Sequence, residues 1–348
     1  MVEIIKILGG GIAGLTAAIN LTDSSEEVTV YELHQRIGMK FKPNCQLLPN
    51  WHSKEDILSH LRKFKIKINW KTKIDFVDIY SPDLRHKAEI FSDERPIGYT
   101  LIRGGDESFE CDLAKQAKKK GVRIVTNFKD KIDADIIATG AKYPEGLGYG
   151  GVLSGHFNKR KAIILFDYNL APGGYVYFLP HSNKLATIAL AMRKWDNPKI
   201  QFNRLTEHPL FKKIFQSSEI LYNFSGIANG TTKKIPKTAK LENSLLVGEA
   251  AGFQDNAYGF GIRYSIISAY LASKSILEGL DYDDLWKNVF LDELKRTRMI
   301  RIVLDKANNV FLNKLVAKIG RKSIDELTDI WASKKSLAFY YFKTLFKR

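Results

Sequence analysis

The chain has 348 residues, and its 54 Lys and Arg against 38 Asp and Glu give a formal net charge of +16. Apolar residues make up 45% and charged residues 26%, which excludes wholesale disorder. No apolar run approaches the roughly 18 residues of a membrane-spanning helix. We expect a cytoplasmic protein of about two domains, because no signal peptide is recognisable and Cys45 and Cys111 are too few for a disulfide framework. The basic charge leaves nucleic acid, anionic lipid and an acidic protein open as partners.

The first elements follow the order strand, glycine-rich turn, helix, strand, acid. A strand is predicted over 3–8, followed at once by the turn Gly9-Gly10-Gly11-Ile12-Ala13-Gly14. A helix is predicted over 15–21 and a second strand over 27–31, ending at Glu32. This order is typical of a dinucleotide-binding unit.

Each part of that unit has a structural role in binding a dinucleotide. Gly9 permits the tight turn, Gly11 lets a pyrophosphate approach the backbone, and Gly14 lets the helix pack on the strand. The helix N-terminus offers N–H groups to the phosphates. Glu32, eighteen residues after Gly14, is placed to bind the ribose hydroxyls, and its charge disfavours a 2′-phosphorylated cofactor.

Two later segments offer further backbone N–H groups. Residues 135–140 read as a buried strand that ends in the turn Ala138-Thr139-Gly140. A strand near 245–247 leads through an acidic turn and the loop Gly259-Phe260-Gly261 to a helix over 264–277. Such a loop and helix N-terminus can meet a phosphate or a flavin ring.

The chain resembles the FAD-dependent geranylgeranyl reductase family of the aromatic-hydroxylase-like flavoproteins. The resemblance rests on the glycine fingerprint at 9–14, the turn at 138–140 and the segment 248–262, and it spans about residues 1–280. It implies an α/β fold in which a Rossmann-like FAD-binding domain is interleaved with a β-sheet substrate domain and followed by C-terminal helices. The implied boundaries are 1–50, 96–158 and 241–284 for the FAD-binding domain, 51–95 and 159–240 for the substrate domain, and 285–348 for a basic helical region.

The same resemblance implies a set of FAD-binding residues. Glu249 stands where the family usually has an Asp that reaches a ribityl hydroxyl, a change of one methylene. Arg103 is expected near the pyrophosphate or the flavin edge, with an ordinary surface arginine as the alternative. The implied residues are Gly9, Gly11, Ile12, Ala13, Gly14, Glu32, Leu33, Arg103, Ala138, Thr139, Gly140, Gly248, Glu249, Gly259, Gly261 and Ile262.

A β-rich block lies between these segments, with strands predicted over 161–170, 175–180, 185–192 and 220–224. Its segment Tyr175-Val176-Tyr177-Phe178-Leu179-Pro180 resembles the strand that lines the isoprenoid pocket of geranylgeranyl reductases. The resemblance makes Tyr175, Tyr177, Leu179 and Pro180 pocket residues. An aromatic-rich strand without a pocket is the alternative.

Tyr175, Tyr177 and Cys45 are the candidate catalytic residues. The resemblance implies that reduced flavin delivers a hydride to one carbon of an alkene, and that Tyr175 or Cys45 protonates the other. Cys45 is equally interpretable as a buried apolar side chain. The seven histidines form no recognisable metal-ligand cluster, so no metal site is expected.

The C-terminal region carries half of the excess charge. Residues 291–348 hold fourteen Lys and Arg against six Asp and Glu, a net of +8. Apolar residues recur at helical spacing over 300–319, and Ser323 with Glu326 predicts a capping box. The aromatic and basic segment 337–348 either covers the core or rests on anionic lipid. Nucleic acid is disfavoured, because no recognition motif accompanies the charge.

These features predict an FAD-dependent oxidoreductase that reduces carbon–carbon double bonds of a prenyl (geranylgeranyl-type) lipid. The chain shows no second G-x-G-x-x-G unit, so electrons are expected from transiently bound NAD(P)H or from an acidic ferredoxin. Two alternatives stay open. One is a flavin monooxygenase acting on a lipid or an aromatic compound, and the other is a non-catalytic prenyl-binding protein like the Rab GDP-dissociation inhibitors.

Overall fold

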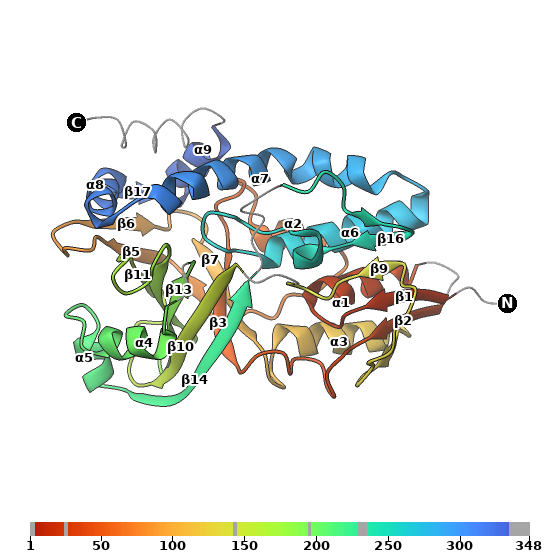
Figure 1. The fold of residues 1–348 in the computed structure, drawn as a ribbon, viewed down its shortest axis with the longest axis horizontal. Coiled ribbons are helices and arrows are strands. Elements are labelled where there is room, and N and C mark those ends of the chain that lie inside the picture. The colour runs from red at the N-terminus through yellow and green to blue at the C-terminus, as the bar shows by residue number, and fades with distance from the viewer. Residues whose placement is uncertain (1–3, 24–26, 142–144, 194–195, 229–234, 334–348) are drawn as a thin grey trace.

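Three β-sheets organise the chain in the computed structural model, which describes residues 4–23, 27–141, 145–193, 196–228 and 235–333 (Figure 1). The predicted interfacial segment 337–348 lies outside these residues. The two larger sheets lie at opposite ends of the view in Figure 1, and the helices near the C-terminus run above both.

The first sheet contains the glycine fingerprint. Its six strands have the order β15-β16-β9-β1-β2-β8, with parallel pairing throughout except between β15 and β16. Strands from the beginning, middle and end of the chain thus lie side by side. Helix α1 packs against α3 and α6. The bounds are β1 Ile4–Leu8, β2 Glu27–Tyr31, β8 Arg123–Val125, β9 Ile136–Ile137, β15 Lys240–Leu241, β16 Ser244–Leu246, α1 Ile12–Leu21, α3 Phe109–Lys119 and α6 Ile262–Glu278.

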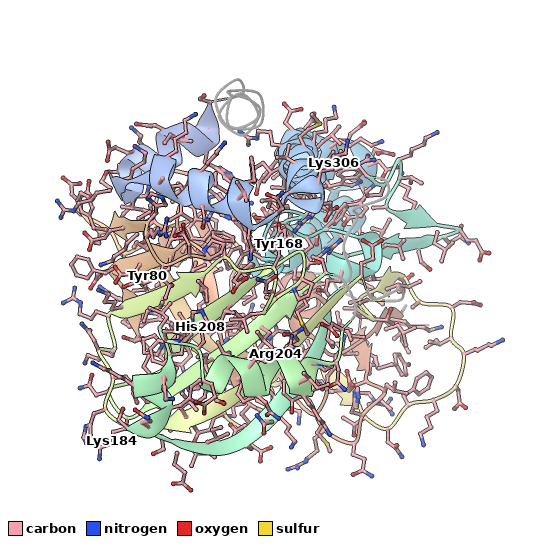
Figure 2. The ribbon with its side chains drawn as sticks, turned by 60° about the vertical axis from the view of Figure 1, so that its left-hand side comes forward. Tyr80, Tyr168, Lys184, Arg204, His208 and Lys306 are labelled. Carbon is pink, nitrogen blue, oxygen red and sulfur yellow. The ribbon has the colours of Figure 1, made fainter. Side chains whose placement is uncertain are left out.

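The second sheet is mainly antiparallel and carries the aromatic strand. Its eight strands have the order β14-β10-β13-β12-β11-β5-β6-β17, and helices α4 and α5 pack against β10, β13 and β14. Figure 2 labels Arg204 on α4 and His208 just after it, on the outer side of this sheet. The bounds are β5 Phe76–Tyr80, β6 Lys87–Phe91, β10 Gly146–Ser154, β11 Lys161–Leu165, β12 Tyr175–Pro180, β13 Leu185–Met192, β14 Glu219–Ala228, β17 Arg321–Ser323, α4 Pro198–Thr206 and α5 Lys212–Gln216.

A small third sheet joins the other two. It has the order β3-β7-β4, formed by Asn44–Pro49, Gly98–Arg103 and Lys73–Ile74. Strand β3 packs against β12 and β13, and β7 packs against α3, so this sheet lies between the two larger ones. Helix α2, Ile57–Arg62, follows β3 in the chain.

The chain ends in three described helices, α7 Tyr282–Lys306, α8 Asn309–Ile319 and α9 Ile324–Ala332. The helical spacing of apolar residues over 300–319 is confirmed as two helices, since the apolar residues of α7 and α8 pack in one core with Trp331 of α9. The capping box is confirmed too: Ser323 Oγ accepts from Glu326 N at 3.2 Å, and Glu326 Oε2 accepts from Ser323 N at 2.7 Å. Within the described residues, no helix combines the length and the apolar character needed to cross a membrane.

The α/β fold predicted from the sequence is confirmed, with two local differences. The strand expected over 161–170 ends at Leu165, because Asp167 forms a turn: its backbone oxygen accepts from Leu170 N and Ala171 N, and its carboxylate accepts from Asn169 N. Strand β10 belongs by its hydrogen bonds to the eight-stranded sheet, although it lies in the range 96–158 expected for the FAD-binding domain. The sequence did not predict β10 as a strand, because this segment is rich in glycine and contains few β-branched residues.

Candidate functional site

A cavity of about 820 Å³ lies where the three sheets meet. This volume is at the upper end of the usual range for small-molecule sites. Its walls come from both halves of the fold: the glycine turns of the first sheet form one part, and β5, β11, β12, α8 and α9 form another. The cavity therefore connects the predicted cofactor region with the predicted substrate region.

The glycine turn before α1 leaves open space beside Gly11. A Cβ atom built on Gly11 meets no heavy atom within 4 Å, whereas one built on Gly14 would lie 1.9 Å from the Gly9 carbonyl oxygen. Gly14 therefore permits close packing of helix on strand, while Gly11 faces the cavity. No acid lies in the first turn of α1, and no described side chain caps its N-terminus. The N–H groups and the positive dipole end there fit a pyrophosphate. We call the glycine turn at 9–14 and the N-terminus of α1 the dinucleotide cradle.

Glu32 at the end of β2 closes this cradle. Its Oε2 accepts from Gly10 N at 2.8 Å, and its Oε1 accepts from His34 N at 2.9 Å and lies 2.6 Å from His34 Nδ1. Glu32 and His34 both line the cavity. A carboxylate held at this position fits the hydroxyls of an adenosine ribose. The sequence did not predict His34 as a site residue, because its position depends on the conformation of the turn after β2.

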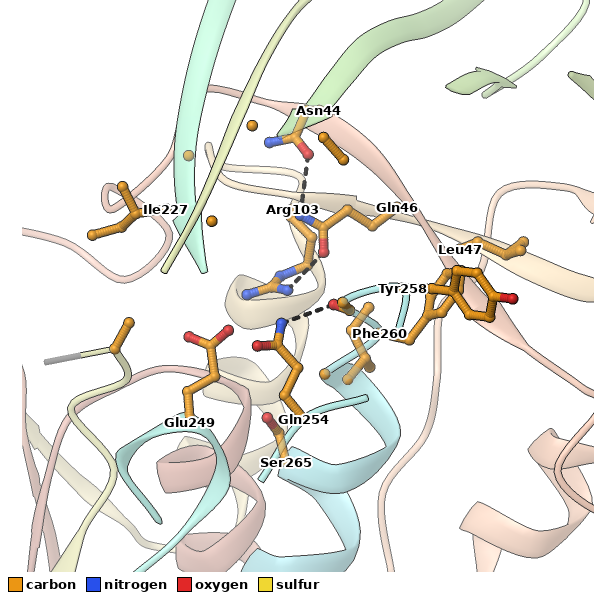
Figure 3. Close-up of a pocket in the computed structure, with 18 of the residues that line it drawn as sticks. Asn44, Gln46, Leu47, Arg103, Ile227, Glu249, Gln254, Tyr258, Phe260 and Ser265 are labelled. Atoms are coloured by element: carbon orange, nitrogen blue, oxygen red, sulfur yellow. Dashed lines mark hydrogen bonds between the residues drawn. The ribbon is translucent and has the colours of Figure 1, made fainter. Parts of the chain in front are cut away.

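The loop before α6 forms the second cradle. Asp255 Oδ1 accepts from Ala257 N at 2.7 Å and from Tyr258 N at 3.0 Å. Gln254 Nε2 donates to the Gly259 carbonyl oxygen at 2.8 Å (Figure 3). These bonds hold the loop against the cavity. Gln254 and Asp255 stand within the resemblance segment 248–262, but sequence reasoning assigned them no role.

Glu249 and Arg103 point toward the same part of the cavity (Figure 3). Burial raises the pKa of Glu249, and the charges of Lys40 and Arg103 oppose that rise. Arg103 also pairs through Nε with Glu110 Oε1 at 2.5 Å and donates from Nη1 to Gln46 Oε1 at 3.1 Å. Lys40, which lines the cavity, was not singled out in the sequence.

The other part of the cavity is apolar. The side chains that line it come from β5, β6, β11, α8, α9 and the segment before β7. They include Val77, Ile79, Ile90, Ile97, Ala162, Ile164, Leu315, Ile319 and Leu327. Trp51 and Phe260 meet edge to face between this branch and the glycine loop, with ring centroids 5.2 Å apart. A branch of this composition fits a flexible hydrocarbon chain.

Tyr175 connects β12 with the second cradle. Its hydroxyl donates to the Tyr258 carbonyl oxygen at 2.6 Å, and both residues line the cavity. Burial raises the pKa of Tyr175, and burial likewise raises the pKa of Tyr177. Both phenols therefore stay protonated and can donate hydrogen bonds at neutral pH.

Most of the expected site residues line the one cavity, but four do not. Gly14 and Gly248 lie in the packing beneath it, and Pro180 ends β12 outside the lining. Cys45 is fully buried in an apolar cluster, and burial raises the pKa of its thiol. The expected residues that line the cavity are Gly9, Gly11, Ile12, Ala13, Glu32, Leu33, Arg103, Ala138, Thr139, Gly140, Tyr175, Tyr177, Leu179, Glu249, Gly259, Gly261 and Ile262.

Comparison with known proteins identifies the fold. Residues 7–49 match the family model of an NAD(P)-binding Rossmann-like domain. Over its full length the chain superposes on a geranylgeranyl bacteriochlorophyll reductase-like protein from Thermoplasma acidophilum, with a TM-score of 0.76 and 17% identity, covering 99% of this chain and 100% of that one. A flavoprotein/dehydrogenase from Cytophaga hutchinsonii (TM-score 0.65, 14% identity, 98% and 99% covered) and a flavin-dependent brominase (0.63, 12%, 99% and 98%) share the fold. The chain has the fold of FAD-dependent flavoproteins.

Two named reductases are similar to this chain in amino-acid sequence. A digeranylgeranylglycerophospholipid reductase of Methanospirillum hungatei is 26% identical over 188 residues, which cover 49% of this chain and 45% of that protein. A second such reductase, from Methanosphaera stadtmanae, is 26% identical over 133 residues, 38% of this chain and 33% of the relative. The matched stretch thus spans less than half the length of either relative. The resemblance seen in the motifs is confirmed by these matches and by the shared fold.

The residues present fit FAD. The open space at Gly11, the carboxylate of Glu32 and the loop before α6 form one continuous wall of the cavity. The two glycine loops, Arg103 and Glu249 line the same cavity and would hold FAD. Among the described residues, no group of three or more His, Cys, Asp and Glu side chains is arranged to hold a metal ion.

We expect Asp255→Asn to flatten the pH dependence of stability between about pH 4 and pH 7. The Asp255 side chain is buried, and desolvation raises its pKa to about 7. Over this range the folded protein keeps the proton that the unfolded chain has released, so unfolding releases a proton and stability falls as the pH rises. Asn is neutral throughout and still offers an oxygen to Ala257 N and Tyr258 N.

Thermal unfolding at matched ionic strength between pH 5 and pH 8 measures this effect. The wild type should lose more stability across the range than Asp255→Asn. Asp329→Asn, which changes an exposed carboxylate on α9, is the control and should follow the wild type. Parallel curves for the wild type and Asp255→Asn would contradict the expectation.

Proposed function

We propose that the protein is an FAD-dependent oxidoreductase that reduces carbon–carbon double bonds of a prenyl, geranylgeranyl-type lipid. The observation that carries this proposal is the continuity of one cavity from the dinucleotide cradle to an apolar branch, with Tyr175 at the junction. The names of the two curated relatives, both digeranylgeranylglycerophospholipid reductases, support the substrate class.

The chain's own residues would bind the substrate and supply the proton. Reduced FAD, when bound, supplies a hydride to one carbon of the alkene. The apolar wall holds the prenyl chain and excludes water, which strengthens every polar interaction inside. Tyr175 and Tyr177 line the cavity as protonated phenols, so either can deliver a proton to the second carbon. Cys45 is the weaker choice, because it does not line the cavity.

A second candidate function is a flavin monooxygenase. The shared fold with a flavin-dependent brominase favours it, since that enzyme uses the same scaffold for different chemistry. Oxygen uptake stimulated by a lipid or aromatic substrate, with a hydroxylated product, would support this alternative. A protein without flavin absorbance bands would instead favour a non-catalytic prenyl-binding role.

The proposal is tested by reducing the FAD-loaded protein under anaerobic conditions and adding a geranylgeranyl lipid. Reoxidation of the flavin together with a product two mass units heavier per reduced bond is the expected result. A stable reduced spectrum with every prenyl lipid tried would reject the proposal. NAD(P)H and an acidic ferredoxin are compared as donors in the same assay, because a net charge of +16 favours encounter with an acidic protein.

We further propose a peripheral membrane position, with 337–348 as the contact. The support is compositional: five aromatics and three terminal cations in twelve residues suit an anionic lipid surface. We expect a chain that ends at residue 336 to bind anionic vesicles more weakly than the full chain, as measured by sedimentation with the vesicles.

Tyr175→Phe is expected to retain FAD and to slow alkene reduction about 100-fold, the usual contribution of a positioned general acid. The variant removes the hydroxyl that bonds the Tyr258 carbonyl oxygen. Single-turnover reoxidation measures the rate, and flavin absorbance measures retention. Tyr177→Phe and Cys45→Ala serve as comparisons. The proton donor is the residue whose substitution slows alkene reduction while the protein keeps its flavin. An unchanged rate in Tyr175→Phe would contradict its role.

A further inference from the structure

We propose that Arg301 and Arg193 form an anion subsite in the cavity that binds the phosphate-class headgroup of the prenyl substrate. This inference rests on the proposed function and adds to it the polar end of the substrate. It concerns a residue of α7 and the residue after β13, and no motif in the sequence marks either one.

Arg301 is a buried guanidinium with spare donors. Its side chain is 3% exposed and lines the cavity. Nη1 donates to the Ala257 carbonyl oxygen at 3.3 Å, and Nε lies 2.9 Å from Asp305 Oδ1. Nη2 has no well-aligned hydrogen-bond partner among the described residues, and the Tyr168 hydroxyl is the neutral group that interacts with this guanidinium. A buried donor without such a partner is costly, so this nitrogen points to a ligand that the cavity receives.

Arg193 shares this part of the cavity. It follows β13 directly, lines the cavity, and is 20% exposed, with Nη2 3.3 Å from Glu145 Oε2. Burial lowers the pKa of Arg193, and the positive charge of Arg301 lowers it further. Glu145 and Asp305 oppose this lowering. Both guanidinium groups line the cavity, so an anion bound near both would relieve their repulsion.

Three carboxylates interact with the two arginines: Asp305 and Glu145 pair with them, and the buried Asp255 interacts electrostatically with Arg301. The Asp305 side chain is 47% exposed and the Glu145 side chain 23%, whereas Arg301 is almost completely buried. Tyr168 closes the wall beside them: its hydroxyl donates to the Leu304 carbonyl oxygen at 2.8 Å, and Figure 2 shows it next to the end of α7 that carries Lys306. Nε of Arg301 is directed to Asp305 and Nη1 to Ala257, which leaves Nη2 as the nitrogen available to a ligand in the cavity.

A forked guanidinium is suited to phosphate, because its parallel N–H groups match two oxygens at once. The cofactor's own phosphates are accounted for by the N-terminus of α1, on a different element. The arginine pair adjoins Ala257 and Tyr258, the residues whose carbonyls bond Arg301 and Tyr175. A headgroup anchored there leaves the prenyl chain to run past Tyr175 into the apolar branch. The anchor would thereby restrict which double bonds reach the flavin.

Isothermal titration of the oxidised, FAD-loaded protein tests the subsite with three probes: geranylgeranyl phosphate, geranylgeraniol and inorganic phosphate. Arg301→Gln should weaken geranylgeranyl phosphate about tenfold or more, as expected for loss of a charge-assisted bidentate contact. Its affinity for geranylgeraniol should stay within about twofold of the wild type. Arg321→Gln, which removes an exposed cation on β17, is the matched control and should bind all three probes as the wild type does.

The outcomes separate the alternatives. Equal weakening of geranylgeranyl phosphate and geranylgeraniol, or no weakening of either, would overturn the subsite and leave Arg301 a structural residue. Tight binding of inorganic phosphate that equals the binding of the phosphorylated lipid would assign the site to a free anion and overturn the headgroup proposal. Where Arg301→Gln loses FAD or fails to fold, Arg193→Gln at the partly exposed partner gives the same comparison, with a smaller expected loss.

The subsite and the proposed function can fail independently. Alkene reduction that is equally efficient with geranylgeraniol and geranylgeranyl phosphate would reject the subsite and keep the function. The expected binding pattern without reduction of any prenyl double bond would reject the function and keep an anion site for a prenyl ligand.

Discussion

Gly11→Val is expected to yield a folded protein that no longer retains FAD. The backbone of Gly11 has an ordinary negative φ of −81°, and a Cβ atom there would meet no protein atom within 4 Å. The valine methyl groups would therefore enter the space in front of the α1 N-terminus without disturbing the fold. This is the space that a pyrophosphate needs to reach the backbone N–H groups.

The measurement is the ratio of flavin to protein after purification and after reconstitution with FAD. We expect flavin occupancy to fall about tenfold or more, which corresponds to about 1.4 kcal/mol or more of binding free energy. The melting temperature of the apoprotein should shift by only about 2 °C, as for a substitution that disturbs no packing. Gly11→Ala should give a smaller loss of flavin.

Gly14→Ala provides the contrast. A Cβ atom at Gly14 would lie 1.9 Å from the Gly9 carbonyl oxygen, so this smaller substitution should damage the fold itself. Flavin bound normally by Gly11→Val would refute the assignment of this turn to the pyrophosphate. A well-folded Gly14→Ala protein would refute the packing role of Gly14.

Leu327→Trp is expected to block long prenyl chains while leaving FAD in place. Leu327 lies on α9 and lines the apolar branch, at the far end of the cavity from the glycine fingerprint. An indole there would fill the space of several methylenes of the substrate. Loss of burial of about four methylenes, at about 0.8 kcal/mol each, lowers kcat/KM about 200-fold.

Steady-state kinetics with a geranylgeranyl lipid and with a single-isoprene alcohol measure this effect. The short substrate should lose less than about threefold, because it does not extend into the branch. Val310→Trp is the matched control: it adds the same side chain to α8 at a position that is 63% exposed. Equal losses for the long and short substrates would contradict a prenyl branch and indicate a change in folding or flavin binding.

Much of the cofactor cradle could be predicted from the sequence, because its parts are local. The strand at Ile4–Leu8, the turn with Gly11 and the helix after it are neighbours in the chain, and Glu32 follows the next strand. Each of these residue types answers a short-range requirement of backbone conformation or phosphate approach. The resemblance then identified the distant segment with Glu249 as part of the same site.

The pocket side of the site was less predictable. The strand Tyr175–Pro180 was located correctly, yet the Tyr175 hydroxyl bonds a backbone carbonyl 83 residues away, which no local pattern encodes. Cys45 was a reasonable candidate by residue type, but its strand carries it into an apolar cluster beside the cavity. The arginines of the proposed headgroup subsite, Arg193 and Arg301, match no local motif: Arg301 lies within the amphipathic helix α7, and Arg193 follows β13.

The dinucleotide turn, the order of the motifs and the C-terminal region with half of the net charge can all be read from the amino-acid sequence, because spacing and composition are properties of the chain. The sharing of one cavity by the glycine loops and an apolar branch, and the burial of Arg301 on α7, become visible only in the folded protein. A cavity is lined by side chains from three sheets and the C-terminal helices, and these meet through packing over long sequence distances.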